Sequence, residues 1–113
     1  MSTDPLSIES LCAGFGLPDW VLGFDHIPRG RVSFGCGKLD TIGGEAVALG
    51  ASRVLIVTDP GIARTGAVAR AVASMEAAGL FVAVFDQVRE NPSTEDVERC
   101  VSSARAAGTD LIV

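Results

Sequence analysis

The sequence predicts an α/β fold, a Rossmann-like doubly wound parallel sheet, and three observations carry this prediction. The run Val54 to Val57 is entirely apolar, and a strand without a polar face is typical of a parallel sheet covered on both sides. A second apolar run, Leu80 to Phe85, and a third, Asp110 to Val113, follow it with helical patterns between them. Strand, helix, strand, helix, strand in this order indicates a right-handed β-α-β-α-β unit.

The part of the chain before the first buried strand divides into an extension and the start of a domain. Residues 1–30 carry only a short helical pattern, Pro5 to Cys12, and we interpret them as an N-terminal extension. Residues 31–113 are predicted to form an incomplete nucleotide-binding domain, which opens with a half-buried strand over Arg31 to Phe34 because that stretch alternates. A helix from Lys38 to Gly50 should follow, with one apolar stripe made by Leu39, Ile42, Ala46 and Leu49.

The helix expected after the central strand has a clear start and a clear end. Asp59 followed by Pro60 is a plausible N-cap with proline in the first turn. Gly79 closes the helix. Its apolar stripe is predicted to consist of Val68, Val72 and Met75.

The next connection is a loop from Asp86 to Pro92, followed by another helix. Ser93 with Asp96 three residues later approximates a capping box at the start of this helix. Gly108 ends it. The residues expected to face inward are Val97, Val101 and Ala104.

Composition and charge exclude several classes of function. The net charge is -5, and the Lys and Arg residues are scattered, so we expect no nucleic-acid partner. No apolar segment approaches the ~20 residues that cross a bilayer, and no signal-peptide pattern opens the chain, so we expect no membrane association and a cytoplasmic location. Three cysteines without a Cys-x-x-Cys pair fit a reducing compartment, and the single histidine, His26, cannot form a histidine metal site.

The carboxyl end of the central strand is the place where a ligand is expected. Ligands of open parallel sheets bind just beyond the strand ends, which here are occupied by Thr58, Asp59 and Pro60. Asp59 could be only an N-cap, or it could accept hydrogen bonds from the ribose hydroxyls of NAD, and both interpretations stay open. Asn91 could belong to a turn or face the same crevice. The glycines of Gly35-Cys36-Gly37 match a dinucleotide fingerprint only in part, and a simple turn is favoured.

Taken in order, several of these motifs carry a family resemblance. The series Phe34-Gly35-Cys36-Gly37, Arg53 to Asp59, Gly66, Asn91-Pro92-Ser93 and Asp110 to Val113 resembles the amino-terminal domain of the iron-containing alcohol dehydrogenases. The resemblance implies an oxidoreductase in which a metal polarises an alcohol oxygen and a hydride passes to a nicotinamide ring. It also implies a second, all-helical metal domain, which this chain lacks.

Residue by residue, the resemblance assigns a cofactor site and no catalytic or metal residue. Asp59 is similar to the family's acidic residue near the adenosine ribose, which favours NAD over NADP, and Asn91 is similar to the asparagine that lines the nucleotide cleft. Thr58 and Pro60 flank that site. The intact parent would use iron or another divalent metal and a small alcohol or aldehyde. The resemblance is compatible with a homo-oligomer, but these residues specify neither the substrate nor the oligomeric state.

The sequence departs from the family where the phosphate-binding loop and the metal ligands should be. The glycine-rich loop that should follow Val113 and the metal-binding histidines are absent, so we expect a fragment that is inactive alone. Two alternatives remain. One is a non-catalytic remnant or α/β binding module that pairs through its open sheet edge. The other is a receiver-like domain, which is disfavoured because no acidic pair follows the first predicted strand.

Overall fold

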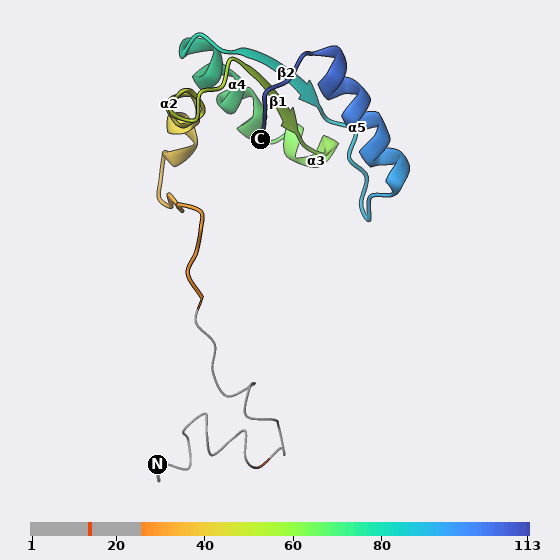
Figure 1. Cartoon of the computed structure of the whole chain (residues 1–113), viewed down its shortest axis with the longest axis horizontal. Helices are drawn as coiled ribbons and strands as arrows, with labels where there is room; N and C mark the ends of the chain where they lie inside the picture. Colours follow the sequence, from red (N-terminus) through yellow and green to blue (C-terminus); the bar gives the residue numbers. More distant parts are fainter. Residues whose placement is uncertain (1–13, 15–25) are drawn as a thin grey trace. The chain divides into compact units, whose positions relative to one another are not determined.

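The computed structural model describes residue 14 and residues 26–113 (Figure 1). The chain divides into two units, 1–32 and 33–113, and the fold below is that of the second unit. The described residues 26–32 contain no helix or strand. The predicted helix Pro5 to Cys12 lies outside the described residues.

A parallel sheet with the order β2-β1-β3 is the centre of residues 33–113. Strand β1 (Arg53–Val57) lies between β2 (Phe81–Phe85) and β3 (Leu111–Ile112), and both pairings are parallel. Pairing with β1 continues past β3, because the Val113 amide donates to the Leu55 carbonyl at 3.0 Å. The predicted α/β parallel fold is therefore confirmed.

The two faces of this sheet are covered by different helices. The chain crosses from β1 to β2 through α3 (Pro60–Ala63) and α4 (Ala67–Ala77), and from β2 back to β3 through α5 (Thr94–Ala106). Right-handed crossovers in opposite directions place their helices on opposite faces. Accordingly, α4 and α5 lie on opposite sides of the strands (Figure 1). This is the doubly wound arrangement.

The main core lies on the face covered by α4 and by α2 (Ile42–Ala48). Met75 of α4 is 0% exposed, and successive residues of β1 alternate between the faces, so Val54 and Ile56 point toward α4 while Leu55 points toward the other face. The cluster on the α4 face consists of Ala46, Val54, Ile56, Ala71, Met75 and Leu80.

Two predictions about the first half of the domain need correction. Arg31 to Phe34 form no strand, and Phe34 is 95% exposed, because no described strand pairs with this stretch and alternation alone supplies no hydrogen-bond partner. The helix predicted from Lys38 begins as a 3-10 turn, η2 (Lys38–Thr41), and ends at Ala48, so Leu49 is exposed instead of completing the stripe. The glycine turn at Gly35 to Gly37 is confirmed, with Gly37 at φ 74°.

The helix predicted after β1 is interrupted, and the stripe predicted for α5 is wrong at Val97 and Val101. Gly66 adopts φ 85° between α3 and α4, which separates them into two helices. In α5, Val97 and Val101 are 60% and 41% exposed, whereas Asp96 is only 3% exposed. The capping-box carboxylate points inward in place of the apolar stripe, because it is surrounded by hydrogen-bond donors.

Candidate functional site

The strand order creates a crevice at one end of the sheet. From β1 the chain passes to β2 on one side of β1 and then to β3 on the other side. A topological switch point therefore lies between β1 and β3. Ligands of open α/β sheets bind outside the carboxyl ends of the strands at such a point. Thr58 and Asp59 follow the carboxyl end of β1 directly, and Val113 follows that of β3.

Asp59 caps the short helix α3, as one of the two interpretations of the sequence predicted. Its Oδ1 accepts a hydrogen bond from the Ile62 amide at 2.9 Å, and Pro60 occupies the first turn. Within the described residues this is the one hydrogen bond of the carboxylate, so Oδ2 has no protein partner there. A cap and a ligand contact are therefore compatible, because each would use a different oxygen.

Thr58 joins the loops that follow β1 and β2. Its amide donates to the Phe85 carbonyl at 2.8 Å, and its carbonyl accepts from the Val88 amide at 3.3 Å. The hydroxyl donates to the Asp59 carbonyl at 3.4 Å. These bonds fix the loop after β2 beside Asp59.

An open hollow of about 580 Å³ lies between the two loops. The segment after β1, which includes α3 and its two flanking residues, contributes Asp59, Pro60, Gly61 and Arg64, and the loop after β2 contributes Gln87, Val88, Arg89 and Glu90. Asp59 and Pro60, which are neighbours in the sequence, both line this hollow. Thr58 instead lines a smaller apolar hollow with Val57 and Val113.

Asn91 lines neither of these two hollows. It is exposed and has φ 52°, the left-handed conformation that asparagine tolerates better than most residues. The structure thus supports the turn interpretation of Asn91. A contact between Asn91 and a nucleotide stays a prediction.

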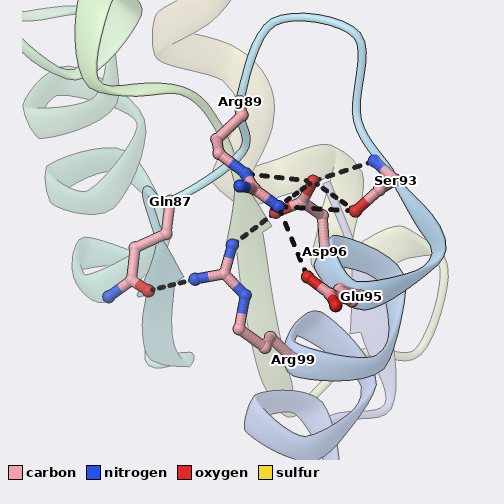
Figure 2. Close-up of polar contacts among 6 residues, drawn as sticks. All are labelled: Gln87, Arg89, Ser93, Glu95, Asp96 and Arg99. Carbon is pink, nitrogen blue, oxygen red and sulfur yellow. Dashed lines mark hydrogen bonds and ion pairs between the residues drawn. The ribbon is translucent and has the colours of Figure 1, made fainter.

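Behind the loop after β2 lies a buried carboxylate, that of Asp96, which the sequence analysis treated only as a cap (Figure 2). Its oxygens accept from the Ser93 amide at 2.9 Å and from Arg89 Nε at 3.1 Å. Arg99 Nη2 also donates to it, while Arg99 Nη1 donates to Gln87 Oε1 at 3.3 Å. The signal in the sequence was the presence of two arginines near a capping-box aspartate.

This environment favours the ionised form of Asp96. The hydrogen bond from the Ser93 backbone and those from Arg89 and Arg99 lower the pKa of the carboxyl group well below its ordinary value, and they outweigh the opposing effect of burial. The same contacts raise the pKa of Arg89. Both groups are charged at neutral pH.

Neither a metal cluster nor a membrane span occurs in the described part of the chain. Among residues 14 and 26–113, no three His, Cys, Asp or Glu side chains are close enough together to hold a metal ion. Nor does any described helix have the length and apolar character needed to cross a membrane. The described residues therefore do not form a metal centre by themselves.

The sequence model for iron-containing alcohol dehydrogenase matches residues 28–113. The chain belongs to the iron-containing alcohol dehydrogenase family. Members of this family are oxidoreductases that contain iron and depend on NAD(P). The resemblance inferred from the motif series is confirmed.

Individual relatives agree with this assignment. The chain is 32% identical over 92 residues to 1,3-propanediol dehydrogenase of Klebsiella pneumoniae, covering 80% of this chain and 24% of the relative. It is 27% identical over 92 residues to sulfoacetaldehyde reductase of Bilophila wadsworthia, covering 81% and 24%. In fold it resembles NADH-dependent butanol dehydrogenase A of Thermotoga maritima, with a TM-score of 0.72 and 24% identity over 80% of this chain and 23% of that one. The chain thus spans about a quarter of the length of these proteins.

Proposed function

We propose that residues 31–113 are the incomplete N-terminal, nicotinamide-nucleotide-binding domain of a metal-dependent alcohol dehydrogenase, preceded by an extension over residues 1–30. The observation that carries the proposal is the place of Asp59, directly after the carboxyl end of the central strand β1, where it lines the hollow between the segments that follow β1 and β2. Family membership supports the chemistry, and the strand order supports the location of the coenzyme.

The Asp59 carboxylate is the proposed partner of the adenosine ribose. Its Oδ2 has no hydrogen bond from the described residues and can accept from ribose hydroxyls, while Oδ1 continues to cap α3. A carboxylate at this place repels a 2′-phosphate, so NAD is the proposed coenzyme and NADP is disfavoured. The residues present fit the adenosine end of the nucleotide.

The other residues proposed for this site have supporting roles. Pro60 shapes the wall of the hollow beside Asp59. Thr58 holds the two loops together through its backbone, and its partly buried side chain faces the crevice near Val113. Asn91 is proposed to approach the nucleotide from the end of the loop after β2.

The intact protein is proposed to interconvert a small alcohol and its aldehyde. The names of its relatives support this substrate class: one is a 1,3-propanediol dehydrogenase and another a sulfoacetaldehyde reductase. When bound, the nicotinamide ring accepts or donates the hydride. This chain positions the coenzyme and contributes no metal ligand among its described residues, so on its own it is proposed to be inactive. Iron or another divalent metal would be held by other parts of the intact enzyme.

The proposal is tested by titrating the 113-residue chain with NAD+ and, separately, with NADP+ while recording amide NMR spectra. We expect NAD+ to shift the amides of Asp59, Gly61 and Val88, and NADP+ to shift them less at the same concentration. Glu76→Gln, an exposed change on α4, serves as the control and should bind like the wild type. Shifts scattered over α4 with none at the hollow would overturn the assignment of the site.

A further inference from the structure

The loop after β2 forms one wall of the proposed coenzyme site and is held at three successive residues. Gln87 Oε1 accepts from Arg99 Nη1 at 3.3 Å, and the Val88 amide donates to the Thr58 carbonyl at 3.3 Å. Arg89 Nε donates to Asp96 Oδ1 at 3.1 Å. Two of these three links lead to α5, and both of them meet at one carboxylate, because Arg99 also donates to Asp96.

Asp96 does more than cap α5. A capping box needs only the exchange between Ser93 and Asp96, which is present here. In addition, the carboxylate binds Arg89, seven residues earlier on the loop, and Arg99, one turn later on the helix. Figure 2 shows both guanidinium groups directed at the Asp96 carboxylate. The side chain of Asp96 is 3% exposed, whereas those of Arg89 and Arg99 are 60% and 46% exposed.

We propose that Asp96 is a positioning residue for the coenzyme, which through Arg89 and Arg99 holds the loop wall facing Asp59 in the shape that receives the adenosine end of a nicotinamide nucleotide. This inference rests on the proposed function of the hollow. Arg89 lines that hollow directly, and Gln87, which Arg99 restrains, lines it beside Arg89. Asp96 itself is not one of the lining residues, so its effect on the ligand is transmitted through these side chains.

Glu95 provides a matched control within the same helical turn. Its side chain is 81% exposed and its ion pair with Arg89 is long, at 3.9 Å, so it carries the same charge near the same helix N-terminus and holds the loop far less firmly than Asp96 does. Replacing either acid removes one negative charge from the first turn of α5, so both replacements weaken the interaction with the helix dipole to a similar extent. Only replacement of Asp96 releases the loop.

The experiment compares wild type, Asp96→Asn and Glu95→Gln in the full chain, using two measurements. Amide hydrogen exchange at Val88 reports whether the loop is held, and NMR titration with NAD+ reports binding. In Asp96→Asn we expect about tenfold faster exchange at Val88 and about tenfold weaker NAD+ binding, the equivalent of one charge-assisted hydrogen bond. Glu95→Gln should match the wild type within about twofold in both measurements.

Two further variants guard against unfolding and against a purely structural effect. Arg99→Gln leaves the capping box in place and removes the contacts of Arg99 with Asp96 and Gln87, so it should loosen the loop and weaken binding even if Asp96→Asn does not fold. Asp96→Glu preserves the charge and the capping-box chemistry and should restore most of the binding that Asp96→Asn loses.

The outcomes separate this inference from the proposed function. Normal Val88 protection and normal NAD+ binding in both Asp96→Asn and Arg99→Gln would overturn the positioning role while leaving the coenzyme site intact. Faster Val88 exchange with unchanged NAD+ binding would also overturn it, because Asp96 would then be purely structural. If saturating NAD+ shifts no amide of the hollow in the wild-type chain, the assignment of this hollow as the coenzyme site fails, and the coenzyme role of Asp96 fails with it.

Discussion

Gly43 of α2 lies against the backbone of Ser74 in α4, so closely that a Cβ on Gly43 would stand 2.2 Å from the Ser74 carbonyl oxygen. The Gly43 amide also donates to Ser74 Oγ at 3.0 Å, and that hydroxyl donates to the Asp40 carbonyl at 2.7 Å. The glycine therefore permits a close contact between the two helices that cover the core face of the sheet.

Gly43→Ala should destabilise the domain although alanine is the better helix former. Overpacking against the Ser74 backbone costs roughly 1–3 kcal/mol, which exceeds the gain of about 1 kcal/mol in helix propensity. Gly44→Ala is the matched control, because a Cβ there meets nothing within 4 Å. It should stabilise the domain by about 0.5–1 kcal/mol. Urea unfolding of both variants checks this, and equal effects of the two changes would contradict the packing role of Gly43.

This glycine illustrates which parts of the fold the sequence could predict. Apolar runs without a polar face identified the three strands, and cap chemistry identified the ends of the helices at Asp59, Ser93 and Gly79. A contact between helices distant in sequence leaves no local signal, so the sequence alone did not reveal the packing role of Gly43. The alternation over Arg31 to Phe34 was misleading for the related reason that a strand also needs a pairing partner.

The candidate site was predictable in position but not in its supporting contacts. The rule that ligands bind beyond the ends of parallel strands placed Asp59 at the crevice from the sequence alone. The role of Asp96 required knowing that Arg89 and Arg99 converge on it, which is a property of the folded loop. The predicted inward stripe of α5 was wrong at Val97 and Val101, which are exposed, whereas the hydrogen-bonded carboxylate of Asp96 is buried.

Met75→Ala should be among the most damaging single changes in the core. Met75 is 0% exposed and packs in the cluster between α4 and β1, so its truncation leaves a cavity and costs about 2–5 kcal/mol in the free energy of unfolding. Val97→Ala, at an exposed apolar position of α5, is the control and should change stability by about 0.5 kcal/mol or less. The comparison is made by urea denaturation. A similar loss from both variants would mean that the core does not lie where the structure places it.

The stability of the domain should fall in acid because of Asp96. Its folded pKa is lowered, so its contribution is fully present above the unfolded value of about 4 and is lost as the pH falls below it. Asp96→Asn should be less stable at pH 7 and should show a shallower decline between about pH 4 and pH 2. Thermal unfolding measured across that range checks the sign. Parallel curves for wild type and Asp96→Asn would mean that another group is responsible for the decline.

The choice between NAD and NADP should depend on two residues that face the same hollow. Asp59→Gly removes the carboxylate that repels a 2′-phosphate, and glycine is a tolerated N-cap, so the change costs only a few tenths of a kcal/mol in stability. Arg64 lines the hollow and forms no ion pair with the described residues, so its guanidinium can then pair with the phosphate. We expect Asp59→Gly to bind NADP+ about tenfold more tightly than the wild type, by the gain of one such charged contact.

The double variant Asp59→Gly, Arg64→Gln tests whether Arg64 carries that gain. It should return NADP+ binding toward the wild-type level, because the phosphate loses its cationic partner while the repulsion stays absent. Arg105→Gln in the Asp59→Gly background is the control: Arg105 is also exposed but lies in the last turn of α5, outside the hollow. Binding is measured by NMR titration with NADP+ and NAD+. An unchanged coenzyme preference in Asp59→Gly would refute the role assigned to Asp59, whereas a gain that survives Arg64→Gln would refute only the role of Arg64.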